Sequence, residues 1–179
     1  MDELIDILDS DGHLTEQTEM KSVAHREGLF HQTVHIWFYT KTGDILLQQR
    51  GKNKATFPLL WDVSVAGHIG AGESIEISAL REIEEEIGLQ ISKQELQKIG
   101  VFKSIHKHSK TLIDCEFHHT FITELKVPLH SLKKQESEVE NLKLIAINQL
   151  KRELKGKEKN SYVPHKASYY EAILKKIKH

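Results

Sequence analysis

The sequence has little of what secreted, membrane-spanning or nucleic-acid-binding proteins need. Its 179 residues include one cysteine, Cys115, so the chain cannot form an internal disulfide, and a reducing compartment suits it. Every apolar run falls short of a membrane span, and the acidic start MDELIDILDSDG has no basic, apolar leader. A formal net charge of −1 gives no general attraction to nucleic acid or anionic membranes. We therefore expect a cytoplasmic protein whose partners are neither nucleic acid nor membrane.

Hydrophobic patterning predicts one domain over residues 1–179, with strands and helices interspersed. Without repeats or low-complexity tracts, this length is enough to bury a core. The predicted strands are residues 4–8, 33–39, 45–49, 60–66, 99–105, 115–125 and 142–147, and the predicted helices are 16–27, 149–154 and 168–177. A turn at residues 9–12 gives an N-terminal hairpin extension over about residues 1–28, and a C-terminal helix falls within about residues 164–178. This order predicts an α/β fold with a mixed sheet packed between helices.

The most informative stretch is Arg81-Glu-Ile-Glu-Glu-Glu86. On a helix, Glu82, Glu85 and Glu86 have the spacing i, i+3 and i+4, so three carboxylates share one face. Such like charges repel unless a cation gathers them, and Mg²⁺ prefers oxygen ligands of this kind. Taken alone, the stretch would also suit an ordinary solvated acidic face.

The flanking residues fit a loop, a helix and a second loop. Gly67 and the glycines at 70 and 72 allow backbone to approach a ligand or a metal closely, and Ser74 is a suitable first residue for a helix. Apolar residues at helical spacing predict a buried stripe, and Gly88 follows the last turn as a stop. The stripe consists of Ile77, Leu80, Ile83 and Ile87. Arg81 lies one turn before Glu85, where its guanidinium can orient a carboxylate.

Residues 67–89 read GHIGAGESIEISALREIEEEIGL and resemble the Nudix box, G-x5-E-x7-R-E-U-x-E-E-x-G-U with U aliphatic. The matching residues are Gly67, Glu73, Arg81, Glu82, Ile83, Glu85, Glu86, Gly88 and Leu89. The seven glycine and charged positions would coincide by chance roughly once in 10⁸ windows. The chain thus resembles the Nudix hydrolases, most of which cleave a nucleoside diphosphate linked to another group, X.

This resemblance implies a fold and a metal site. The fold is an α/β/α sandwich with a mixed sheet, and homodimers are common in it. Mg²⁺ or Mn²⁺ would bind Glu82, Glu85 and Glu86 together with the Gly67 carbonyl, while Glu73 and Arg81 brace the loop-helix-loop. A small-molecule diphosphate would be the substrate.

Hydrolysis would proceed by attack of water on phosphorus, which requires a carboxylate to take the proton of the water. Three candidates stay open: Glu82 and Glu85 in the box, and Glu138 in a later loop. Basic residues beside a predicted strand, Arg50, Lys52 and Lys54, could neutralise phosphate charge, although surface cations are usually just solvated. Trp61 could either pack in the core or line the pocket.

A second resemblance covers roughly residues 2–147. HQTVHIWFY, LLQQR and SVAGH, together with Lys52, Lys54, Pro58 and Trp61, are similar to type I isopentenyl diphosphate isomerase and its Nudix neighbours. The resemblance places the histidine and carboxylate ligands of its metal on His25, His31, His68, Asp114 and Glu116. The match at His25 requires a one-residue gap, and Asp114 replaces a glutamate. Such ligands suit Mg²⁺, Mn²⁺ or Zn²⁺.

One departure separates the chain from that isomerase. Ala66 occupies the place of the catalytic cysteine, and Cys115 does not replace it. The full set of box carboxylates is retained, which favours hydrolysis of a diphosphate. An isomerase that uses another acid, and a non-catalytic ligand sensor, remain as alternatives.

The other histidines carry no comparable pattern. On the predicted strand, His118 and His119 point to opposite faces, so at most one of them can face a site. The rest are expected to be surface or internally satisfied residues: His13, His35, His130, His165 and His179. Substrate identity depends on loops that carry no readable signal.

Overall fold

Strands dominate the computed structural model, which describes residues 2–177. The strands are β1 (Leu4–Leu8), β2 (Leu14–Met20), β3 (Phe30–Tyr39), β4 (Asp44–Arg50), β5 (Trp61–Asp62), β6 (Val65–His68), β7 (Gln97–Lys107), β8 (Ile113–Glu124) and β9 (Val139–Ala146). The helices are α1 (Lys21–Glu27), α2 (Ile75–Ile87), α3 (Ile147–Glu153) and α4 (Ala167–Lys176). Short 3₁₀ turns occupy Lys93–Glu95, Leu129–Ser131 and Lys157–Ser161.

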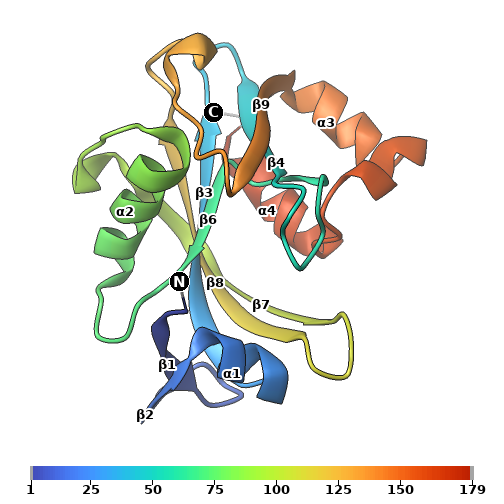
Figure 1. The fold of residues 1–179 in the computed structure, drawn as a ribbon. Coiled ribbons are helices and arrows are strands. Elements are labelled where there is room, and N and C mark those ends of the chain that lie inside the picture. The colour runs from blue at the N-terminus through green and yellow to red at the C-terminus, as the bar shows by residue number, and fades with distance from the viewer. Residues whose placement is uncertain (1, 178–179) are drawn as a thin grey trace.

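Strand β3 is the centre of the sheet (Figure 1). It runs parallel to β8 along its whole length and antiparallel to β1, β4 and β6. The sheet extends from β1 to β2, from β8 to β7, and from β4 to β5 and β9. One parallel pair among antiparallel pairs makes the sheet mixed, as the sequence predicted.

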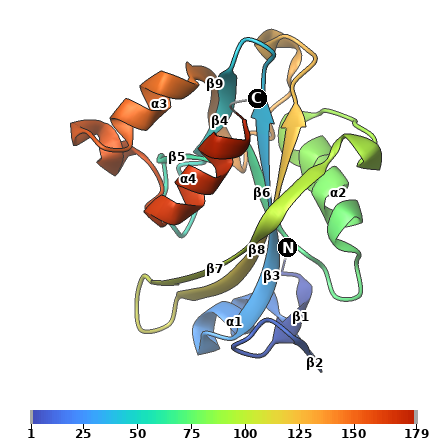
Figure 2. The same ribbon diagram turned by 180° about the vertical axis from the view of Figure 1, so that it is seen from behind.

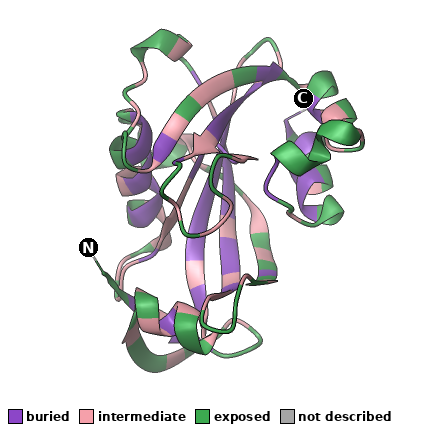
Figure 3. Ribbon diagram, turned by 45° about the vertical axis from the view of Figure 1, so that its right-hand side comes forward, coloured by how far each residue is buried: buried purple, intermediate pink, exposed green. Residues whose placement is uncertain are grey.

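Helices cover both faces of this sheet (Figures 1 and 2). Because side chains alternate along a strand, Ile36 and Phe38 of β3 face α2, where they pack with Ile83. Trp37, between them, packs on the other face with Tyr169 of α4. The buried residues concentrate in the central strands and the inner sides of the helices (Figure 3). The predicted α/β/α sandwich is confirmed.

Helix α2 begins and ends where the sequence predicted, and of the predicted stripe Ile83 and Ile87 are fully buried but Ile77 is not. Ser74 caps its start by accepting from the Ile77 amide at 3.4 Å, and Gly88 ends it in the left-handed region at φ 65°. Ile77, expected inside, is 60% exposed, whereas Ala79 and Ile83 are fully buried. Two residues along a helix correspond to about 200° of rotation, so Ile77 faces away once Ala79 packs on the sheet.

The N-terminal extension differs from the prediction in its second half. Residues 16–27 were predicted as one helix, but Leu14–Met20 is strand β2 and only Lys21–Glu27 is helical. Strand β2 pairs with β1 across the predicted turn. Backbone N–H and C=O groups of residues 14–20 therefore bond to β1 instead of forming the hydrogen bonds of a helix. Gly28, at φ 65°, ends α1 at the predicted position.

The predicted strand at residues 60–66 is two short strands. The chain leaves β4 after Asp62 and joins β3 at Val65. Ser64 makes the crossing possible, because its hydroxyl donates to the Leu46 carbonyl at 2.5 Å and accepts from the Phe38 amide at 2.8 Å. Further along, β7 reaches Lys107, so His106 lies on a strand and not in a connection between the predicted strands 99–105 and 115–125. The described part of the predicted C-terminal helix is α4; residue 178 lies outside the described residues.

Replacing Ile83 with alanine should destabilise the protein by about 2–5 kcal/mol, because it removes a fully buried side chain and leaves a cavity between α2 and β3. Ile77→Ala on the same helix is the matched control and should change stability by about 0.5 kcal/mol or less. Urea unfolding followed by circular dichroism measures both. Similar losses in the two variants would contradict the burial pattern of α2.

Candidate functional site

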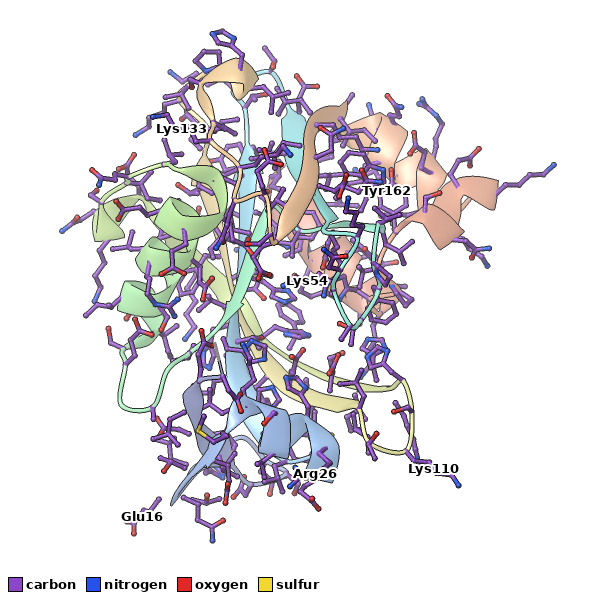
Figure 4. The ribbon with its side chains drawn as sticks, in the orientation of Figure 1. Glu16, Arg26, Lys54, Lys110, Lys133 and Tyr162 are labelled. Atoms are coloured by element: carbon purple, nitrogen blue, oxygen red, sulfur yellow. The ribbon has the colours of Figure 1, made fainter. Side chains whose placement is uncertain are left out.

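A cleft of about 470 Å³ lies beside β6, a strand that pairs only with β3 in the described sheet. The acidic side chains of α2 reach β6 from one side, and histidines of β3, β6 and β8 lie on the other face of the sheet. Lys54, on the β4–β5 connection, also lines the cleft and lies near the middle of the molecule (Figure 4). Most of the lining is polar or charged, so the cleft is built for a polar ligand.

Gly67 allows the closest approach in this region. A Cβ atom at this position would collide with the Glu82 side chain, so only glycine lets helix α2 pack this close to β6. Burial raises the pKa of Glu82, and the neighbouring Arg81 opposes that rise. Glu82 therefore lies where the predicted metal site requires a carboxylate next to the Gly67 backbone.

Glu86 is the most buried of the three box carboxylates. Its Oε2 accepts from the Ala66 amide at 3.1 Å and from Gln48 Nε2 at 3.0 Å. Burial, reinforced by repulsion from Glu82, raises the pKa of Glu86 to about 8. A carboxylate in this state gains strongly from a nearby cation, as a metal site requires. Glu85, half-exposed, completes the acidic wall of the cleft.

Arg81 ties the two ends of the box together. Its Nε and Nη2 both donate to the Glu73 carboxylate at 3.1 Å, and Nη2 also donates to the His68 carbonyl at 3.1 Å. Nη1 lies 2.7 Å from Glu82 Oε1 and 3.3 Å from Glu85 Oε2. The bracing contact expected of Glu73 and Arg81 is present, and Arg81 in addition holds two of the acidic side chains in place.

Four side chains converge on a second point in the cleft: His25, His31, His68 and Glu116, whose ligand atoms all lie within 4.8 Å of one another. His25 Nε2 and His68 Nε2 are 3.2 Å apart, and His31 Nε2 is 3.5 Å from Glu116 Oε1. A tetrahedral ion with bonds of about 2.0–2.1 Å would separate its ligands by about 3.3 Å, and these two separations are close to that value.

The hydrogen bonding of this cluster also suits a metal. His31 Nδ1 donates to the Leu29 carbonyl at 2.9 Å, so Nε2 is the nitrogen directed at the cluster; burial opposes protonation of this ring, but the neighbouring Glu116 outweighs burial and raises the pKa of His31. That Nε2 is buried and has no hydrogen-bond partner among residues 2–177. Burial lowers the pKa of His68 well below its usual value, which keeps this imidazole neutral, as a metal ligand must be.

Asp114 stands behind the cluster rather than in it. Its Oδ1 lies 2.8 Å from His25 Nδ1, and its Oδ2 lies 2.8 Å from His108 Nε2. The expected five-residue set thus divides into four converging residues and one carboxylate that lies against His25.

The expected phosphate-binding residues are only partly brought together. Arg50 and Lys54 line the cleft, where Arg50 Nη1 donates to Asp62 Oδ2 at 3.2 Å and Lys54 pairs with Glu138. Lys52 is exposed and outside the cleft lining, and Trp61 packs against the core beside α4.

Several cleft residues carried no signal in the sequence. Lys21, at the start of α1, lines the cleft although it lies far from every motif. His35 and His165, expected to be unremarkable, line it together with Asp62 and His118. His118 faces the cleft and His119 does not, in line with their predicted opposite orientations. His13 and His130 are exposed, as expected, and His179 lies outside the described residues.

Comparison with known proteins places the chain in a family. The NUDIX domain family model matches residues 29–166. An uncharacterized Nudix hydrolase of Clostridium acetobutylicum is 34% identical, over 98% of this chain and 97% of that protein. Nudix hydrolase 3 of Arabidopsis thaliana is 33% identical over 92% of this chain. The match covers 22% of that longer protein. The chain belongs to the Nudix family, and these relatives support a Nudix pyrophosphohydrolase.

The isomerase branch is represented as well. Isopentenyl-diphosphate Delta-isomerase of Nocardia farcinica is 31% identical, over 83% of this chain and 82% of that protein.

Among solved structures, a Deinococcus radiodurans protein superposes with a TM-score of 0.72 at 18% identity, covering 99% of this chain and all of that one. A bifunctional NMN adenylyltransferase/ADP ribose pyrophosphatase of Francisella tularensis, complexed with AMP and a Mn ion, has a TM-score of 0.57 at 15% identity. That superposition covers 82% of this chain and 41% of the other. These two likenesses support the fold. Within residues 2–177, no helix combines the length and apolar character of a membrane span.

Without metal, Glu86→Gln should be more stable than the wild type at pH 8, by about 2 kcal/mol or more. A carboxyl whose pKa rises on folding, here to about 8, binds its proton more tightly in the folded state, so stability is lost as pH rises from about 4.5 towards 8. The glutamine carries no charge, so the advantage should shrink as pH falls towards 5.

Thermal unfolding in EDTA at a series of pH values would measure this difference. Equal stability of the two proteins at pH 8 would contradict a buried Glu86 carboxyl whose pKa is raised on folding. Added Mg²⁺ or Mn²⁺ should favour the wild type instead.

Proposed function

We propose that this protein is a cytoplasmic, metal-dependent hydrolase of the diphosphate linkage in a nucleoside diphosphate derivative or a similar organic diphosphate. The observation that carries the proposal is the convergence of Glu82, Glu85 and Glu86 on one wall of a polar cleft. Gly67 has no Cβ atom, and this leaves room for the Glu82 side chain. Basic residues line the same cleft, so an anionic substrate would meet both a cation site and positive side chains.

Mg²⁺ or Mn²⁺ would be held by Glu82, Glu85 and Glu86 with the Gly67 carbonyl. The raised pKa values of Glu82 and Glu86 support this assignment, because two neighbouring buried carboxyls need a counter-charge to be ionised together. The chemistry that such an ion supplies when bound is polarisation of phosphoryl oxygens and activation of water. A second ion would be held by His25, His31, His68 and Glu116.

The side chains have separate tasks in this proposal. Arg50, Lys54 and Lys21 would neutralise phosphate oxygens, and Arg81 would hold Glu82 and Glu85 in position. A carboxylate must accept the proton of the attacking water, and Glu82, Glu85 and Glu138 all line the cleft. Burial alone would raise the pKa of Glu138, but its pairing with Lys54 lowers it, so Glu138 is ionised and able to accept a proton near neutral pH.

Glu85→Gln should reduce metal-dependent hydrolysis by about 10²-fold or more while leaving the fold intact, because it removes a carboxylate from the acidic wall. Glu84→Gln is the matched control, because Glu84 is exposed on the same helix turn and lies outside the cleft lining. Its Oε1 accepts a hydrogen bond from Gln90 Nε2 at 2.6 Å. Phosphorus NMR with Mg²⁺, over a panel of nucleoside diphosphate sugars, dinucleoside polyphosphates and isopentenyl diphosphate, measures turnover. Full activity in Glu85→Gln would refute the assignment.

The histidine cluster favours a second candidate, an isomerase of isoprenoid diphosphates. The cluster occupies the positions of the isomerase metal, and the Nocardia relative bears that name. Ala66 offers no acid, so another cleft residue would have to protonate the double bond. Isomerisation in deuterium oxide would incorporate deuterium without releasing phosphate, and proton and phosphorus NMR separate these products from those of hydrolysis.

His68→Asn should lower the number of bound Mn²⁺ or Zn²⁺ ions by one per chain, because it removes one of the four converging ligands. His119→Asn, on the opposite face of β8, is the control and should bind as the wild type does. Elemental analysis after equilibrium dialysis gives the stoichiometry. An unchanged stoichiometry in His68→Asn would show that the cluster holds no ion.

A further inference from the structure

Three histidines outside the proposed metal cluster meet inside the cleft. His35 of β3 and His118 of β8 lie side by side, with ring centroids 4.0 Å apart and planes inclined by 18°. His165 approaches from the segment before α4, with its centroid 5.5 Å from His35 and 6.0 Å from His118. All three line the cleft. We call His35, His118 and His165 the imidazole floor; neither of the proposed ion sites uses them.

The imidazole floor begins one row of side chains along the sheet from the metal cluster. His31 is opposite Glu116 in the β3–β8 register, and Thr33, in the next row on the same face, is opposite His118. Side chains two residues apart on one face of a strand are separated by about 7 Å. An organic group attached to a diphosphate at the metal cluster would therefore extend over the floor.

His165 presents a hydrogen-bond acceptor. Its Nε2 lies 2.8 Å from Asp62 Oδ1, while Arg50 Nη1 donates to Asp62 Oδ2 at 3.2 Å. Burial alone would raise the pKa of Asp62, but His165 and Arg50 lower it, so this carboxylate is ionised and only accepts hydrogen bonds. The proton of this contact is then on Nε2 of His165, and in the neutral form of the ring Nδ1 is the acceptor nitrogen.

His35 presents a donor. Trp37 Nε1 donates to the Tyr169 hydroxyl at 2.9 Å, and that hydroxyl lies 2.7 Å from His35 Nδ1. Since an indole N–H can only donate, the single proton of the hydroxyl stays available for donation to Nδ1 of His35. Burial keeps the pKa of His35 well below its usual value, so the ring is neutral and carries its proton on Nε2.

A donor and an acceptor on neighbouring rings match one kind of organic group. A hydroxyl both donates and accepts, so it can bind His35 and His165 at the same time. A hydrocarbon in the same place would remove water from both nitrogens and return no hydrogen bond, which is unfavourable. The floor therefore discriminates by hydrogen bonding.

We propose that His35 and His165 form a hydroxyl-recognising subsite for the group X, and that the protein prefers diphosphates of sugars or other polyols over diphosphates of hydrocarbons such as isoprenoids. The proposal rests on the proposed function, because the diphosphate anchor is what places X over the floor. It selects against the isomerase candidate, whose substrate carries only hydrocarbon.

Two ligands that share a diphosphate and a five-carbon chain test the subsite: ribityl diphosphate and n-pentyl diphosphate. Calorimetric titration of the Glu85→Gln chain with Mg²⁺ gives both dissociation constants, and phosphorus NMR checks that the ligands stay intact. We expect ribityl diphosphate to bind at least about tenfold more tightly, since a site built for hydroxyls rejects the analogue that lacks them.

His35→Leu and His165→Leu, each made in the Glu85→Gln background, should bring the ratio of the two constants to within about twofold. His119→Leu, on the opposite face of β8, should leave the ratio unchanged. Because both ligands are measured on the same protein, a lower folded fraction in a variant cancels from the ratio. His165→Gln, whose amide reaches the position of Nε2 and can both donate to Asp62 and accept from a ligand, should retain a preference for the hydroxylated ligand.

Three results would overturn the subsite: equal affinities of the two ligands for the Glu85→Gln chain, binding of neither ligand to it, or an unchanged ratio of dissociation constants in both leucine variants. Failure of the proposed function has a separate signature in the wild-type protein. There, phosphorus NMR would show both ligands and the wider panel of diphosphates intact with Mg²⁺ or Mn²⁺, whatever the ratio of affinities.

Discussion

Carboxylates packed against a strand backbone define this site, and the surrounding architecture depends on that packing. Glu82 and Glu86 are buried beside β6, and burial raises the pKa of both, with repulsion from Glu82 adding to the rise at Glu86. Arg81 offsets part of this repulsion by contacting Glu73 and Glu82 at once. The absence of a side chain at Gly67 removes the steric barrier. The same close packing of α2 on β6 fixes the position of His68 on the other face of the sheet.

Much of the acidic half of the site could be predicted, because its information is local. Glu82, Glu85, Glu86 and Arg81 lie on one helix, whose spacing determines which side chains are neighbours. The buried stripe was harder to predict. Ile77 and Ala79 both suit a helix, and the sheet accepts the smaller residue on its surface while leaving the larger one in solvent.

The histidine half could be predicted only where a family pattern marked it. His35 meets Tyr169 across 134 residues of sequence, and His165 meets Asp62 across 103. A single histidine on a strand has no periodicity that distinguishes a cleft residue from a surface residue, so both were expected to be unremarkable. Lys21 escaped notice for the same reason, since only the pairing of β1 with β2 and β3 brings α1 to the cleft.

Over residues 31–35 of β3 and 116–120 of β8, one face carries polar side chains in successive rows, while the opposite face packs core residues against α2. The parallel register sets His31 against Glu116 and Thr33 against His118, so both strands contribute to each row. A one-residue slip would exchange the two faces and bury these polar groups against α2. The strict alternation of β3 and β8 therefore protects the site as much as it protects the core.

Pairing of β3 with β8 also determines when the site can first exist during synthesis. Thr33 and His118 are 85 residues apart in sequence, and no local hairpin can bring their strands together. Until β8 has left the ribosome, β3 lacks the neighbour that covers its whole length, and its apolar residues remain open to chaperones or to other chains. Newly made protein thus exposes these apolar residues before Glu116 emerges, and an ion at the proposed cluster could not help it fold at that stage, because one of the four proposed ligands would not yet have been made.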